Sequence, residues 1–145
     1  MSLDGAYDPD NIFAKIVRGE APAAKVYEDH DTLAFMDVFP QGHGHVLVVH
    51  KRSHARNLMD ADPAELAAVI TTVQRMVLAV RAALKPDGVF VAQFNGSAAG
   101  QTIFHLHFHV IPRWNGTPLG RHGGDGMADM GELRSLAEQI ANEIA

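Results

Sequence analysis

The sequence predicts an α+β fold with a largely antiparallel five-stranded sheet, one long helix and two shorter helices. Its 145 residues are 47% hydrophobic and 20% charged, which suits one domain with a single core. Short β-type runs recur along the chain, and one long segment has apolar residues at helical spacing. The order of these elements is helix, three strands, long helix, two strands and a last helix, which favours an antiparallel sheet.

The first half of the chain is expected to supply a short helix and three strands. Residues 10–19 suit a short helix, because Asp8 or Asp10 can cap its start and Gly19 suits the left-handed position after its end. β-branched and apolar residues then recur in short runs between turn residues, the pattern of strands. These runs occupy residues 25–28, 32–38 and 45–49.

The second half begins with the long helix. Asp62 can cap it, with Pro63 at its first position, and apolar residues recur at helical spacing until Leu84. This helix is expected to cover one face of the sheet. The elements expected after it are strands at residues 89–94 and 102–111, a closing Pro112, a flexible segment at 115–129 and a helix at 132–145.

Composition excludes several classes of function. The formal charge of −5 and the pI near 5.9 argue against a dedicated partner of nucleic acid or of an anionic membrane. Cysteine is absent, so disulfides, thiolate zinc sites and cysteine nucleophiles are excluded. The polar start lacks the features of an export signal, and the long helix carries charges, so a cytoplasmic protein without a membrane span is expected.

Histidines alternate with apolar residues in the last predicted strand. His105, His107 and His109 would lie on one face of it, because successive side chains of a strand point to opposite sides. Burial of one unpaired polar ring costs ~1–3 kcal/mol, so a row of three predicts function rather than packing. The apolar set that faces the core is Phe104, Leu106, Phe108 and Val110.

Two functions fit such a row. Imidazoles can bind a metal, or one can act as a nucleophile while the others stabilise an anion. No carboxylate lies in residues 89–112, so the anion is favoured and no metal is expected. Backbone amides of the turn 95–100 and the side chains of Gln101 and Thr102 can hold phosphate oxygens, and His45 can add another imidazole.

Residues 105–111, His-Leu-His-Phe-His-Val-Ile, resemble the His-φ-His-φ-His-φ-φ signature of the histidine triad superfamily, where φ is apolar. The lead-in at residues 100–104 is similar too. Upstream blocks resemble the Hint-like branch of this superfamily, and they lie at residues 12–16, 20–23, 27–29, 32–37 and 44–48, with Pro40 between the last two. The resemblance implies a single HIT domain over residues 1–145, with its core at about 11–112 before the flexible segment and the last helix.

The resemblance also implies an activity: hydrolysis or transfer at the α-phosphorus of purine ribonucleotide conjugates, in particular nucleoside phosphoramidates, without a cofactor. In that family pattern His107 would attack phosphorus and form a covalent nucleotidyl-histidine. His109 would contact the phosphate and assist the leaving group. His105 would orient the neighbouring ring, and His45 would complete the network.

The same resemblance implies a set of substrate-binding residues. Asp37 would hold the ribose hydroxyls, while Gln101 and Thr102 would lie beside the phosphate. The branch usually has an asparagine where Phe94 aligns here, so Asn95, one step later, is a candidate for a substrate contact. The apolar slot for the purine would be formed by Ile12, Phe13, Ile16, Phe35 and Val38.

Alternatives remain open at this point. A dinucleoside polyphosphate hydrolase of the Fhit-like type, a regulatory nucleotide-binding protein with incidental activity, and a metal-binding protein each fit part of the pattern. The family is usually homodimeric, so Trp114 and the tail after it could approach the partner's pocket. His50, His54 and His122 lie outside the triad and receive no role.

Overall fold

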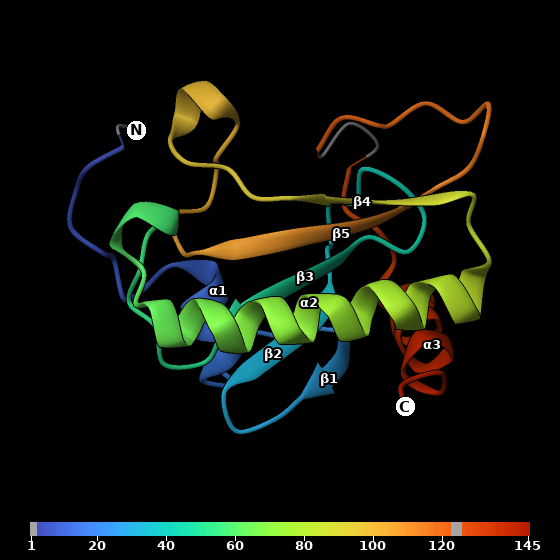
Figure 1. Cartoon of the computed structure of the whole chain (residues 1–145), viewed down its shortest axis with the longest axis horizontal. Helices are drawn as coiled ribbons and strands as arrows, with labels where there is room; N and C mark the ends of the chain where they lie inside the picture. The colour runs from blue at the N-terminus through green and yellow to red at the C-terminus, as the bar shows by residue number, and fades with distance from the viewer. Residues whose placement is uncertain (1–2, 123–125) are drawn as a thin grey trace.

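The computed structural model describes residues 3–122 and 126–145, which form a five-stranded sheet and three α-helices (Figure 1). The strands lie in the order β1-β2-β3-β5-β4, and each neighbouring pair is antiparallel. The α+β fold expected from the sequence is therefore confirmed. The strands are β1 (Lys25–Glu28), β2 (Thr32–Met36), β3 (Val46–His50), β4 (Gly88–Ala92) and β5 (His107–Arg113), and the helices are α1 (Ile12–Val17), α2 (Pro63–Leu84) and α3 (Met130–Ala141).

The helices begin where capping side chains stand. The carboxylate of Asp62 accepts a hydrogen bond from the Ala64 amide at 2.8 Å and starts α2, as predicted. The helix ends at Lys85, which adopts the left-handed conformation with φ 52°. In α1 the cap is Asn11 rather than the predicted Asp8 or Asp10, and its side chain accepts from the Ala14 amide.

The two faces of the sheet have different coverings. α2 and α3 pack on one face, where the alternate strand residues Ala34, Met36, Val46, Val48 and Val110 form a core with them. The other face carries a smaller cluster of Leu33, Phe35, Leu47 and Val49 under α1. His109 pairs with Leu47 and His107 with Val49, so the histidines share this second face.

β5 begins later and ends later than predicted. It starts at His107 rather than at residue 102, because the lead-in is bonded to neighbouring loops; the Leu106 amide, for example, donates to the Ala55 carbonyl. It also continues through Pro112 to Arg113. Pairing with β3 has already ended at Val110, so Pro112 lies where β5 has only β4 beside it and the missing N–H is tolerated.

Other boundaries shift by a few residues. β4 ends at Ala92 instead of residue 94, and α3 begins at Met130, after the capping Asp129, and ends at Ala141. Short 3-10 turns at Leu58–Asp60 and Ser97–Ala99 were not predicted. In the predicted flexible segment 115–129, residues 115–122 and 126–129 form no helix or strand, and residues 123–125 lie outside the described residues.

α2 is long and apolar enough to cross a membrane by length and composition alone. Core helices of globular domains pass the same test. Val69, Val73, Met76 and Val80 on its inner side are buried against the sheet. The expectation that the protein has no membrane partner stays a prediction.

Candidate active site

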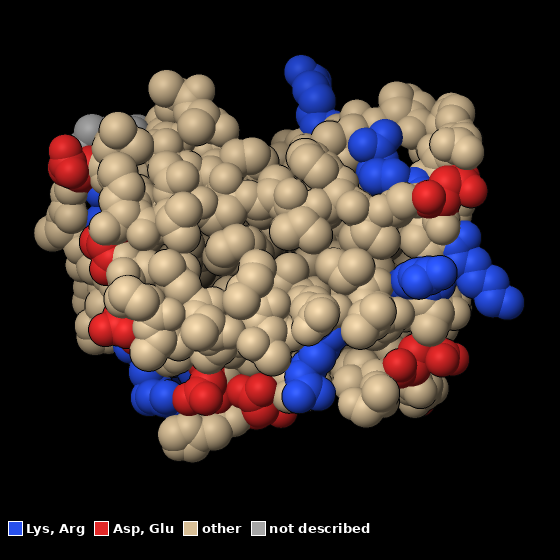
Figure 2. Space-filling model, viewed as in Figure 1, with Lys and Arg blue, Asp and Glu red and all other residues tan. Residues whose placement is uncertain are grey.

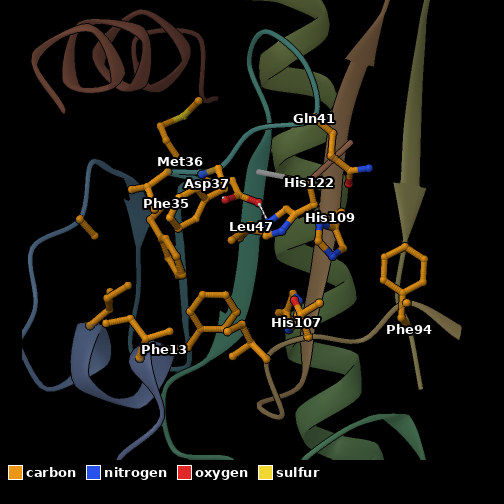
Figure 3. Close-up of a pocket in the computed structure, with 18 of the residues that line it drawn as sticks. Phe13, Phe35, Met36, Asp37, Gln41, Leu47, Phe94, His107, His109 and His122 are labelled. Carbon is orange, nitrogen blue, oxygen red and sulfur yellow. Dashed lines mark hydrogen bonds and ion pairs between the residues drawn. The ribbon is translucent and has the colours of Figure 1, made fainter. Parts of the chain in front are cut away.

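A cavity of about 270 Å³ lies between α1 and the histidine face of the sheet. Phe13 and Phe35 lie on the side of α1 and β2, His107 and His109 border the cavity from β5, and Phe94 lies beyond the histidines (Figure 3). The lining is mostly apolar, so the cavity suits a flat organic group with a few polar contacts at one end. The remaining lining residues are Ile12, Ile16, Pro22, Ala23, Met36, Asp37, Val38, Phe39, Gln41, Leu47, Gly100, Thr102, Ile103 and His122.

His107 is oriented by the backbone of its own segment. Its Nδ1 lies 2.6 Å from the carbonyl oxygen of His105, and a carbonyl only accepts, so Nδ1 must carry the proton. Burial lowers the pKa of His107, while the His105 carbonyl acts in the opposite direction. The ring is therefore neutral at neutral pH, and its Nε2 carries a free lone pair.

A chain of hydrogen bonds fixes the tautomers of His45 and His109. The backbone N–H of Gln41 donates to Nδ1 of His45 at 3.0 Å, so the proton of the neutral His45 ring is on Nε2. That Nε2 lies 2.9 Å from Nδ1 of His109 and donates to it. The proton of His109 is consequently on its own Nε2, available as a donor to a bound group.

Burial keeps both rings neutral. It lowers the pKa of His45 to about 4, although nearby Asp37 acts to raise it. It lowers the pKa of His109 to about 3, with a further contribution from His107. Neighbouring imidazoles penalise each other's charged form, so the row titrates as a coupled set.

Asp37 is a buried carboxylate just after β2. One oxygen accepts from the Phe39 amide at 2.8 Å, and the other lies 3.0 Å from Nε2 of His122 and 3.5 Å from Nε2 of His45. Burial acts to raise the pKa of Asp37, but the His122 hydrogen bond and the nearby His45 outweigh it and the pKa is lowered. The same contact raises the pKa of His122.

The fold brings most of the predicted site residues together and leaves others apart. His107, His109, Asp37, Thr102 and the five predicted slot residues line the cavity, and His45 lies behind His109. Gln101 does not line it, because its amide bonds to the Gly96 amide and the Arg56 carbonyl. Asn95 accepts from the Leu58 amide instead, and His105 faces a separate small cavity. Substrate roles for Gln101 and Asn95 stay predictions.

Sequence reasoning missed two polar residues and an aromatic ring. His122 is 85 positions from Asp37, and no periodicity links them. Tyr7 lies in the N-terminal segment, yet its hydroxyl is 2.9 Å from Nδ1 of His105. The Phe94 ring lies 5.2 Å from the His109 ring. The sequence indicated only that Phe94 stands where the Hint-like branch usually has an asparagine.

Three polar residues around the cavity also have the spacing of metal ligands. Ligand atoms of Asp37, His45 and His109 all lie within 4.8 Å of one another. A metal-bound histidine donates its second ring N–H to an acceptor, whereas Nδ1 of His45 accepts from the Gln41 amide. With its single lone pair already engaged, neutral His45 does not fit a metal ligand.

Histidines that alternate at the start of an interior strand of this antiparallel α+β sheet, and just before it, define a protein of the histidine triad class. The HIT domain model matches residues 18–116, more than half of the sequence, and the chain belongs to the HIT domain family. This confirms the resemblance found in the sequence.

Similar proteins support this membership. A crystal structure of a Hit-like protein involved in cell-cycle regulation from Bartonella henselae is 45% identical, with a TM-score of 0.91 over 97% of this chain and 100% of that one. A Zn-bound histidine triad family protein from Mycobacterium smegmatis is 36% identical, with a TM-score of 0.79 over 92% and 94% of the two chains. The adenylylsulfatase HINT3 of Arabidopsis thaliana is 40% identical over 119 residues, which are 78% of this chain and 60% of that relative.

Proposed function

We propose that the protein hydrolyses purine nucleotide conjugates at the α-phosphorus, in particular nucleoside phosphoramidates, through a covalent bond to His107. The observation that carries this proposal is which ring nitrogens of His107 and His109 hold a proton. Nε2 of His107 has a free lone pair, and Nε2 of the adjacent His109 has a proton to donate. The centroids of the two rings are 4.9 Å apart, so the two histidines lie next to each other in the cavity lining.

The proposed reaction has two displacements. In the first, the lone pair of His107 Nε2 forms a bond to phosphorus, and the bond from phosphorus to the leaving atom breaks. Nε2 of His109 donates a hydrogen bond to the leaving atom, which keeps the electron pair and takes a proton from a water molecule, so the His109 ring stays neutral. In the second, the hydroxide so formed attacks phosphorus, and the P–N bond breaks to restore the lone pair of His107.

The remaining lining residues suit the nucleoside. The base would lie against the aromatic rings of Phe13 and Phe35, which contact each other edge to face at 5.5 Å, and against the aliphatic residues beside them. The ribose hydroxyls would donate to Asp37, whose second oxygen is bonded to His122 in the structure. Substrate binding would therefore share or replace the His122 contact.

The charge of the lining bears on the leaving group. No Lys or Arg is among the described residues that line the cavity, so a polyphosphate leaving group would find no permanent cation there. An uncharged amine fits better, with Phe94 beside the proton donor His109. Sulfate, the leaving group suggested by the name of the Arabidopsis relative, is the second candidate because the same phosphorus would be attacked.

The experiment is an assay of AMP release from adenosine 5′-phosphoramidate in the presence of a chelator, with wild type, His107→Ala and His30→Ala. His30 is exposed in the turn between β1 and β2, so it serves as the matched histidine control. We expect release by wild type and His30→Ala only, and an AMP adduct on His107 by mass spectrometry of quenched wild type.

Other outcomes would redirect the proposal. Release by His107→Ala at the wild-type rate would contradict the nucleophile. Faster turnover of diadenosine polyphosphate or adenylyl sulfate than of the phosphoramidate would show that the preferred leaving group is a polyphosphate or sulfate rather than an amine. Slow turnover of all substrates with tight AMP binding would favour a regulatory nucleotide-binding protein.

We also propose a homodimer through the face that carries α2 and the edge strand β4. The centre of this face lacks Lys, Arg, Asp and Glu, which stand at its margins (Figure 2). Ile70 and Leu78 of α2 and Phe90 and Val91 of β4 are exposed apolar residues. Light scattering should give twice the mass of the chain, and Leu78→Glu should shift it toward monomer; a monomeric wild type would contradict the dimer.

A further inference from the structure

The first histidine of the triad is held differently from the other two. Pairing of β5 with β3 begins at His107, so His105 lies outside the ladder of the sheet. The backbone contact next to it is the hydrogen bond from the Leu106 amide to the Ala55 carbonyl. The ring of His105 therefore needs side-chain contacts to fix its position.

Tyr7 supplies such a contact from the N-terminal segment. Its hydroxyl lies 2.9 Å from Nδ1 of His105, and its ring stacks on His54 at 5.0 Å with an interplanar angle of 11°. The His50 backbone carbonyl favours protonation of the His105 ring, but Nε2 has no partner in hydrogen-bond geometry in residues 3–122 and 126–145. Tyr7 thus makes the side-chain hydrogen bond that orients the His105 ring.

The segment that carries Tyr7 is itself anchored beside the triad. The Leu3 carbonyl accepts from the side chains of Arg56 and Asn57, both at 3.3 Å. Gly5 lies so close that a Cβ there would be 2.9 Å from Nη1 of Arg56. The Arg56 guanidinium in turn lies 4.7 Å above the ring of Phe104, the residue before His105.

The position of His105 matters because its backbone holds the nucleophile. Nδ1 of His107 donates to the His105 carbonyl at 2.6 Å, and this bond leaves the lone pair on Nε2. A displacement of His105 would move the acceptor and turn the ring of His107. Nucleophilic attack requires that the lone pair points at phosphorus, so a small rotation lowers the rate of the chemical step.

We propose that Tyr7 is a positioning residue for the triad. Its hydroxyl donates to Nδ1 of His105, holds that residue in place and, through the His105 carbonyl, keeps the ring of His107 in its attacking orientation. The predicted effect on turnover rests on the proposed function. The predicted effect on the two imidazole rings does not.

The chain offers a matched control, because it has two tyrosines. Tyr7→Phe deletes the hydroxyl and keeps the ring that stacks on His54. Tyr27→Phe deletes a hydroxyl that donates to Asp29 at 2.8 Å, and the Tyr27 side chain packs on the α2 and α3 face of the sheet, opposite the triad. Both variants are compared with wild type for thermal midpoint, for kcat and KM on adenosine 5′-phosphoramidate, and for imidazole ¹⁵N chemical shifts.

For Tyr7→Phe we expect kcat to fall about tenfold with KM within about twofold, the loss of one orienting hydrogen bond. The ¹⁵N resonances of His105 and His107 should both shift, whereas Tyr27→Phe should change neither. Unchanged resonances and kcat in Tyr7→Phe would overturn the proposal, as would an equal loss of kcat in Tyr27→Phe. If wild type proves inactive on the phosphoramidate, the resonances alone decide whether Tyr7 positions the rings.

Discussion

The two faces of β5 perform different tasks with the same backbone. Phe108 and Val110 point toward α2 and α3 and pack in the apolar core there. His107 and His109 point toward the cavity, where each ring depends on one or two directed hydrogen bonds. One face therefore contributes free energy of folding, and the other holds polar groups in positions that folding alone would not favour.

This difference teaches where substitutions should act. Changes on the apolar face should reduce the free energy of unfolding and leave the chemistry of the folded molecules intact. Changes on the histidine face should do the reverse, because the proposed reaction uses the lone pairs and protons of the buried neutral rings. The following experiments test that separation, from the largest expected effect to the smallest.

His107→Ala should have the largest effect. Loss of the proposed nucleophile should lower kcat by about a thousandfold or more, whereas the Kd for AMP should change little. The thermal midpoint should stay near that of wild type, because a buried polar ring is removed rather than a core contact. A large drop in the thermal midpoint would show that His107 also contributes to packing, which would contradict the separation between the two faces of β5.

Met76→Ala should destabilise the packing on the apolar face of the sheet. Met76 is fully buried in α2 against the sheet, and its truncation should lower the free energy of unfolding by about 2–5 kcal/mol. Urea denaturation measures this loss, and kcat per folded molecule should stay at the wild-type value. A matched loss of kcat at temperatures where the variant is folded would show that the faces are coupled.

Acid should weaken the histidine face selectively. His45, His105 and His109 have pKa values lowered to about 4, 4 and 3, so the unfolded chain binds more protons below its ordinary histidine pKa of about 6.5. Stability should therefore be complete above that pH and decline as the pH falls toward 4.

Urea denaturation at pH 7 and pH 5 measures the slope. His45→Gln should flatten it, and His30→Ala, which removes an exposed ring, should leave it unchanged. Equal slopes in wild type and His45→Gln would mean that the row is not buried in its neutral form.

His122→Ala should have the smallest effect. Its removal frees an oxygen of Asp37 for the ribose, so KM should fall several-fold with kcat unchanged, the scale of one hydrogen bond. The pKa of His122 is raised, so its charged form holds Asp37 at low pH and releases it as the pH rises through that pKa. KM of wild type should fall over the same rise in pH, and KM of the variant should not; a higher KM in the variant would show that His122 assists binding.

The sequence predicted the fold class and the central site because their signals are local. Helix α2 follows from a cap, a proline and an apolar period, and the shared face of His107 and His109 follows from strand alternation. Asp37 and the slot residues came from the family resemblance; they line the cavity, and their substrate roles stay predictions.

The remaining features depend on contacts between distant segments. The late start of β5 at His107 arises from bonds between its lead-in and residues 55–56, which no periodicity reveals. The engagement of Gln101 inside its loop, the His122 contact with Asp37 and the Tyr7 contact with His105 are tertiary in the same sense. Sequence separation of 85 and 98 positions hid the last two.

The hydrogen bond from the Gln41 amide to His45 has a consequence for how variation can affect this site. The direction of the whole proton chain from His45 to His109 is set by a main-chain group, which every amino acid except proline supplies. Side-chain changes at position 41 can alter the cavity wall without reversing that chain. The side chain at position 41 can therefore vary, while the proton of His109 stays on its Nε2.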